Sequence, residues 1–109
     1  MAGNKPVIRL YFAKMKQAFR ELSDEEKIAF MRKDRENLDK LGMKAVTMID
    51  CSWSNEEWDY IGVEQWPSME AIEKREKFEN EVLEVSRYVQ SKTLLGTPES
   101  FADYGKSDT

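Results

Sequence analysis

Histidine is absent from this sequence of 109 residues, and Cys51 is its only cysteine. An intramolecular disulfide is therefore impossible. Structural zinc sites use Cys or His ligands, and His is the most common axial ligand of haem, so we expect neither zinc nor haem and predict no cofactor. Catalytic triads that depend on His are also excluded. Any general base must be a carboxylate, a Lys, a Tyr or an activated water.

Long apolar runs and an excess of basic residues are also lacking. The chain has 17 Lys and Arg against 21 Asp and Glu, which gives a formal net charge of −4. An acidic surface repels nucleic acid and anionic membranes. No run approaches the length of a membrane span, and the residues before Val7 do not have the pattern of a signal peptide. We therefore expect a cytoplasmic protein with no nucleic-acid partner and no membrane partner.

The length and the residue pattern predict one domain, residues 1–96, followed by a polar C-terminal arm, residues 97–109. The arm contains two aromatic rings, Phe101 and Tyr104, and we expect it to be ordered only where these rings dock.

Two kinds of segment alternate in the domain. Strands are predicted where β-branched and aromatic residues are concentrated, over 7–15, 44–51, 57–66 and 93–95. Helices are predicted where apolar residues recur at spacings of three and four, over 24–41 and 69–89. The apolar residues expected on the buried stripes are Ile28, Met31, Leu38 and Leu41 in the first helix, and Ile72, Phe78, Val82, Val85 and Val89 in the second. The resulting order, β-α-β-β-α-β, predicts an α+β fold of the ferredoxin-like kind, with a four-stranded antiparallel sheet and two helices on one face.

Local signals support these boundaries. Ser23 and Glu26 are spaced as a capping box, and Gly42 follows the first helix where a left-handed residue is favoured. Pro67 ends the third strand, and Ser68 can cap the second helix. On the helices, Arg35 and Arg75 interrupt apolar stripes, and we expect their stems to pack while their guanidinium groups reach water.

The strands carry two different sets of side chains. A nearly pure apolar set is expected under the helices: Ile8, Leu10, Phe12, Val46, Met48, Ile61 and Val63. A mixed set is expected on the opposite face: Arg9, Tyr11, Ala13, Ala45, Thr47, Ile49, Cys51, Trp58, Tyr60, Glu64 and Trp66. Exposed to water, the mixed set would form a large apolar patch, so we predict that it packs against a second copy in a homodimer.

The segment V-E-Q-W-P-S-M-E-A-I-E, residues 63–73, resembles the strand-to-helix junction of the dimeric α/β-barrel superfamily, in particular its antibiotic-biosynthesis-monooxygenase-like members. This resemblance implies a ferredoxin-like fold, a homodimer and a ligand cavity in each half of the barrel. Its members include monooxygenases, isomerases and haem-degrading enzymes. Many members have a His early in the second helix. Here Lys74, Arg75 and Glu76 occupy that segment, which argues against the haem-type and His-dependent branches.

A candidate ligand-binding site follows from the mixed set. If the first and third strands are antiparallel neighbours, Arg9 should lie close to Glu64, as a structural ion pair or as part of a site. Gly62 leaves room for a mainly apolar pocket. The predicted ligand-binding residues are Arg9, Tyr11, Ile49, Trp58, Tyr60, Gly62, Glu64 and Trp66. Glu64 and Tyr60 are the candidate catalytic groups.

Three classes of function fit these residues. The first is a cofactor-free monooxygenase or isomerase acting on a small, largely apolar molecule, fatty-acid-like or aromatic. The second is a non-catalytic protein that binds such a molecule, and the third is a structural dimer without a ligand. The tryptophans Trp53, Trp58 and Trp66 have a second, purely structural interpretation as core or dimer contacts. Cys51 is interpreted as an inert buried thiol.

Overall fold

The structure is a computed structural model that describes residues 5–100, 102 and 104–106. Its elements follow in the order β1 (Val7–Met15), α1 (Gln17–Arg20), α2 (Asp24–Lys40), β2 (Lys44–Asp50), β3 (Tyr60–Trp66), α3 (Met69–Phe78), the π-helical turn η2 (Glu79–Leu83), α4 (Val85–Tyr88) and β4 (Val89–Gly96). No helix in this described part of the chain is long and apolar enough to cross a membrane.

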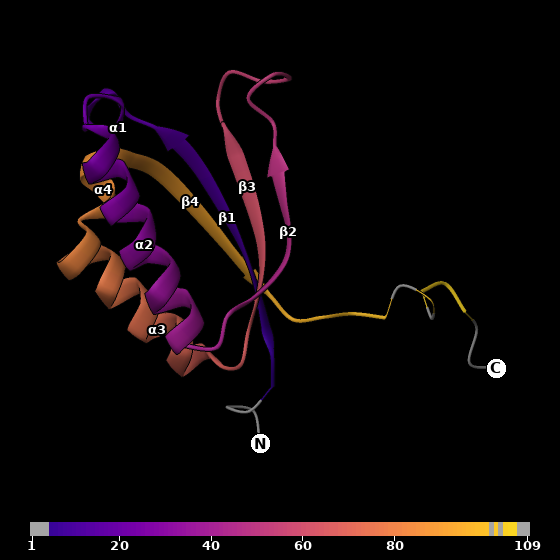
Figure 1. Ribbon diagram of the computed structural model, residues 1–109. Helices are drawn as coiled ribbons and strands as arrows, with labels where there is room; N and C mark the ends of the chain where they lie inside the picture. Colours follow the sequence, from indigo (N-terminus) through magenta and orange to yellow (C-terminus); the bar gives the residue numbers. More distant parts are fainter. Residues whose placement is uncertain (1–4, 101, 103, 107–109) are drawn as a thin grey trace.

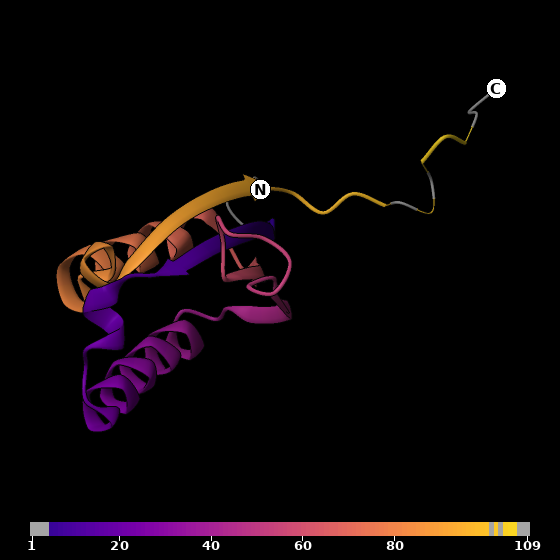
Figure 2. The same cartoon turned by 90° about the horizontal axis from the view of Figure 1, so that it is seen from above.

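The four strands form one antiparallel sheet in the order β2-β3-β1-β4. The connection from β1 to β2 runs through α2 and passes over β3, and the connection from β3 to β4 runs through α3 and passes over β1. Both helices lie on the same side of the sheet (Figures 1 and 2). The predicted α+β fold, with a four-stranded antiparallel sheet covered by helices on one face, is confirmed.

Several local predictions are also confirmed. The Ser23 hydroxyl accepts from the Glu26 N–H at 3.1 Å, and the Glu26 carboxylate accepts from the Ser23 N–H at 2.9 Å, which completes the capping box of α2. Gly42 has a positive φ of 84° just after this helix. The Ser68 hydroxyl accepts from the Ala71 N–H at 3.2 Å and caps α3.

The second helix differs from its prediction of 69–89. It is regular only to Phe78, and the π-helical turn η2 adds a residue to the winding before Glu84 takes a left-handed conformation. This extra residue rotates the helix, so that Leu83 is buried where Val82 was expected, and Val82 is 51% exposed. The last strand is longer than predicted, because it begins at Val89.

The prediction of which sheet face lies under the helices is wrong. The helix side, which we call the helix face, carries Val7, Arg9, Tyr11, Ala13, Tyr60, Gly62, Glu64 and Trp66. Trp66 and Arg9 on this face are 0% and 1% exposed. The mixed set can be buried because the helices supply partners for the buried guanidinium groups: Glu79 for Arg9, and Asp34 and Asn37 for Arg75.

The opposite side of the sheet, the outer face, is therefore apolar. It consists of Ile8, Leu10, Phe12, Ile49, Ile61, Val63 and Leu94. A bulge between Ala45 and Thr47 reverses the alternation of β2, which turns Met48 to the helix face and Ile49 to the outer face. No helix covers the outer face within the described chain (Figure 2). Ile49 and Leu94 are consequently 43% and 48% exposed.

Two apolar clusters hold the helices on the sheet. One joins Val7 and Trp66 to Leu38 of α2 and to Ile72 of α3. The other surrounds Ala13 with Leu83, Val85 and Val89, and Phe30 packs against it. The predicted stripe of α2 is only partly correct, because Ile28 and Met31 are more than half exposed.

The chain after Gly96 leaves the sheet as an extended segment (Figure 1). Tyr104 in this arm is 78% exposed. Phe101, the other ring predicted to dock, lies outside the described residues.

Candidate ligand-binding site

A cavity of about 490 Å³ lies between α2 and the helix face of the sheet. Most of its wall is apolar, and its charged groups are Arg9, Asp34, Glu64, Arg75 and Glu79. The apolar and aromatic side chains of the wall come from the sheet, from α1 and α2 and from the α4 segment, and include Tyr11, Ala13, Met15, Phe19, Phe30, Met31, Leu38, Met43, Ala45, Met48, Tyr60, Val85 and Val89. The size and composition are typical of a site for a small apolar molecule.

The arrangement arises from the register of β1, β3 and β2. Arg9 of β1 is directly opposite Glu64 of β3, and Tyr11 is directly opposite Gly62. Gly62 is in turn opposite Met48 of β2. A Cβ atom built on Gly62 would be 3.6 Å from Glu64 Oε2 and 3.9 Å from Met48 Sδ, which is ordinary contact. The missing side chain of Gly62 therefore opens space beside the Glu64 carboxylate.

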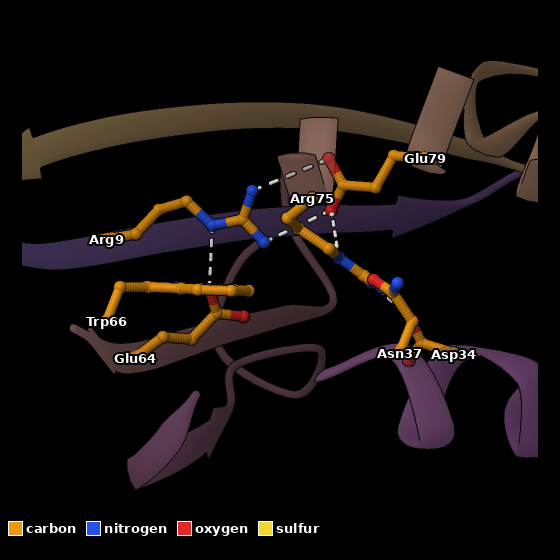
Figure 3. A network of polar contacts seen from close by, with 7 residues as sticks. All are labelled: Arg9, Asp34, Asn37, Glu64, Trp66, Arg75 and Glu79. Atoms are coloured by element: carbon orange, nitrogen blue, oxygen red, sulfur yellow. Dashed lines mark hydrogen bonds and ion pairs between the residues drawn. The ribbon is translucent and has the colours of Figure 1, made fainter. Parts of the chain in front are cut away.

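Arg9 is the centre of the charged end of the cavity (Figure 3). Its Nε donates to Glu64 Oε1 at 2.7 Å, and its Nη2 donates to Glu79 Oε2 at 3.1 Å. The guanidinium carbon lies 5.0 Å from the ring centroid of Tyr11 and 5.2 Å from that of Trp66. Arg9 is thus held by two carboxylates and two rings, as a buried ion pair requires.

Arg75 extends the same network from α3 to α2 (Figure 3). Its Nε donates to Glu79 Oε2 at 3.0 Å, its Nη1 donates to Asn37 Oδ1 at 2.9 Å, and its Nη2 pairs with Asp34. Arg75 is 4% exposed, so the prediction that its guanidinium reaches water is wrong. The same prediction holds for Arg35, whose side chain is 77% exposed.

Glu64 presents its two oxygens differently. Oε1 accepts from Arg9 Nε and also from Trp66 Nε1 at 2.9 Å. Oε2 has no hydrogen-bond partner among the described residues. Every side-chain N or O atom that is fully buried in this part of the chain does have a partner, so Oε2 is not fully buried. Oε2 is therefore reachable from the cavity, although the side chain as a whole is only 13% exposed. It is an acceptor available to a bound molecule.

The electrostatics of the cavity shift two pKa values. Burial alone would lower the pKa of Arg9, but the negative charges of Glu79 and Glu64 and the hydrogen bonds to them outweigh burial and raise it. Burial, together with the charge of Glu79, raises the pKa of the Tyr11 hydroxyl above its usual value. At neutral pH the cavity therefore holds a charged Arg9 and a neutral Tyr11.

The structure brings together five of the eight predicted site residues on the cavity wall: Arg9, Tyr11, Tyr60, Gly62 and Glu64. Trp66 lies beneath them as a fully buried hydrogen-bond donor to Glu64. Ile49 and Trp58 do not belong to this group, because Ile49 is on the outer face and the Trp58 ring lies 5.5 Å from that of Phe12 there. Trp53 is 83% exposed, and Cys51 is buried as predicted.

Sequence reasoning missed the part of the site that the helices contribute: Phe19, Phe30, Asp34, Asn37 and Glu79. One signal was available, because Arg75 and Glu79 are four residues apart and both occur on the buried stripe of the second helix. The positions of Asp34 and Asn37 depend on the rotation of α2 about its axis. Because Ile28 and Met31 are apolar but exposed, the apolar pattern of the helix does not indicate this rotation.

No protein-family model matches the sequence, and no curated protein matches it. Solved structures with a similar fold do exist. One is a protein of unknown function from Rhodopseudomonas palustris, with a TM-score of 0.59 and 17% identity over 88% of this chain and 84% of that chain. The methylated form of that protein gives a TM-score of 0.64 and 20% identity, covering 94% and 85% of the two chains.

A third similar structure is the solution structure of a hypothetical protein from Arabidopsis thaliana. Its TM-score is 0.57 and its identity 12%, with 92% of this chain and 94% of that chain covered. At such identities the likeness shows the fold alone. Among the residues described, no group of three or more Cys, Asp and Glu side chains is arranged to hold a metal ion.

Proposed function

We propose that this protein binds a small, largely apolar molecule, with an aliphatic chain or an aromatic ring system, in the cavity between α2 and the sheet. The observation that carries this proposal is the cavity itself, about 490 Å³ in volume, apolar along most of its wall and polar at the Arg9–Glu64 end. A protein whose interior is closed by its own side chains has few voids larger than a water molecule. The cavity therefore favours a binding protein over a structural dimer without a ligand.

Glu64 supports a second candidate function on the same site. Its Oε2 atom faces the cavity without a donor, so it can accept a proton from a bound molecule. A cofactor-free isomerase or monooxygenase needs such a base. Tyr60 is the other candidate group on the wall. Turnover of a bound compound that is lost in Glu64→Gln, with binding retained, would distinguish the enzyme from the binding protein.

We also propose that the chain is a homodimer of the dimeric α/β-barrel type, formed through the outer face. The mixed face is not available to a second copy, because the chain's own helices cover it. The outer face is the apolar surface left for a second copy, and both of its central strands contribute to it. Native mass spectrometry of purified protein tests both proposals together, because it reports the dimer mass and any small molecule that remains bound.

Ile61→Lys is expected to convert the dimer to a monomer. Ile61 lies on the outer face between Phe12 and Ile49, so the new ammonium would be buried without a partner in a dimer but solvated in a monomer. Sedimentation velocity at micromolar concentration measures the change. Ile28→Lys is the matched control, because Ile28 is 56% exposed on α2 and its replacement should leave the mass unchanged. A wild-type protein that sediments as a monomer contradicts the dimer.

A further inference from the structure

The charged end of the cavity carries an excess of negative charge. Two guanidinium groups, Arg9 and Arg75, face three carboxylates, those of Asp34, Glu64 and Glu79, and these five are the only charged residues on the described wall. The cluster therefore has a net charge of −1. At this end of the cavity, where Arg9 and Arg75 are buried, an unbalanced charge interacts more strongly with a ligand than it would in bulk water.

The two cations of the cluster are already engaged. All three guanidinium nitrogens of Arg9 donate to Glu64 or Glu79. All three guanidinium nitrogens of Arg75 are likewise held, by Glu79, Asn37 and Asp34. Arg9 and Arg75 are also only 1% and 4% exposed, so a ligand carboxylate has little access to either guanidinium and would add a second uncompensated negative charge. The cavity end is therefore unfavourable for an acidic head group.

The accessible polar atom is instead an acceptor. Glu64 Oε2 is directed to the space left by Gly62, and no described residue donates to it. Tyr60, two residues before Gly62 on the same face of β3, also lines the cavity. A carboxylate oxygen without an internal donor recognises an ammonium group through a charge-assisted hydrogen bond.

We infer that the ligand of this cavity is an amine with an apolar body, whose protonated nitrogen binds Glu64 Oε2. This inference rests on the proposed function, since it assigns the head group of a molecule that the cavity must first be able to hold. The hydrocarbon part fills the apolar wall between α2 and the sheet. Glu64 is then the residue that determines specificity, and Gly62 provides the space that the head group occupies.

The test compares three ligands with the same tail and different head groups: decylamine, decanol and decanoate. Each displaces a hydrophobic fluorescent dye from the wild-type protein at neutral pH, where the amine is a cation and the acid an anion. We expect decylamine to bind about tenfold more tightly than decanol, as a charge-assisted hydrogen bond to a buried group allows, and decanoate to bind most weakly.

Two variants assign the preference to the site. In Glu64→Gln, which keeps the size of the side chain and an acceptor for Arg9 and Trp66, the advantage of decylamine over decanol should disappear. Glu70→Gln makes the same change in net charge at a side chain that is 76% exposed, and it should keep the advantage. Gly62→Leu should no longer bind decylamine; isothermal titration calorimetry measures this directly, because this variant is not expected to bind the dye.

The possible failures are distinct. If none of the three ligands displaces the dye, the proposed function itself is wrong. Equal binding of all three, or tightest binding of decanoate, overturns the inference and leaves the proposed function standing. Decylamine binding that survives Gly62→Leu would assign the amine to the acidic surface and also overturns the inference, whether or not Glu64→Gln folds.

Discussion

Gly62→Leu is expected to abolish the binding of hydrophobic dyes and apolar ligands while the protein remains folded. The Cβ atom of the new residue finds ordinary contacts at 3.6 Å and 3.9 Å, so the backbone can stay in place. The rest of the leucine then extends into the space beside Glu64. Because glycine within a strand costs about 0.5–1 kcal/mol relative to alanine, the variant should be no less stable than the wild type. Dye titration measures binding, and urea denaturation measures the free energy of unfolding.

Gly96→Leu is the matched control for this experiment. Gly96 is at the end of β4, and a Cβ atom there has no neighbour within 4 Å in the described structure. The substitution adds the same apolar side chain away from the cavity, so dye binding should be unchanged. If Gly62→Leu binds the dye as tightly as Gly96→Leu does, the cavity beside Gly62 is not the binding site.

Arg9→Met is expected to destabilise the protein by about 3–5 kcal/mol, the usual cost of removing one partner from a buried ion pair. Arg9 is 1% exposed, and its loss leaves Glu64 and Glu79 facing each other with one cation fewer between them. Methionine retains much of the apolar stem, so most of the loss should come from the charges. Because small domains are stable by only about 5–15 kcal/mol, the midpoint of urea unfolding should fall markedly.

Arg35→Met provides the comparison. Arg35 pairs with Asp39 on the same helix, but its side chain is 77% exposed. Exposed pairs contribute about 0–1 kcal/mol, so this variant should unfold close to the wild-type midpoint. Equal stability of Arg9→Met and Arg35→Met would show that the buried network contributes no more than a surface ion pair does.

The sequence was sufficient to predict the elements wherever a local signal determines them. The capping box at Ser23, the left-handed Gly42 and the break at Pro67 depend only on neighbouring residues, and the helix and strand boundaries next to them were correct. The pairing of Arg9 with Glu64 was also predictable, because it follows from antiparallel β1 and β3. The π-helical turn carries no comparable signal, and the prediction of one continuous regular helix failed after Phe78.

The orientation of the sheet could not be derived from the strands alone. Apolar residues usually mark the buried face, and here the more apolar face, with Leu10 and Ile61, is the one left uncovered by the chain's own helices. Burial of the mixed face depends on partners that come from the helices, Glu79 for Arg9 and Asp34 for Arg75. These contacts join residues far apart in the sequence, so no local pattern indicates them.

The direct pairing of Arg9 with Glu64 also protects the chain against misfolding. A shift of β1 by one residue along β3 would turn Arg9 to the outer face and place Ile8 and Leu10 under the helices, among Glu79 and Arg75. A shift by two residues would keep the faces but set Arg9 opposite Gly62 or Trp66, and bury Glu64 without its cation. Each wrong alignment separates a charged group from its partner. The ion pair therefore selects one register of the two central strands among the registers that their apolar residues would otherwise tolerate.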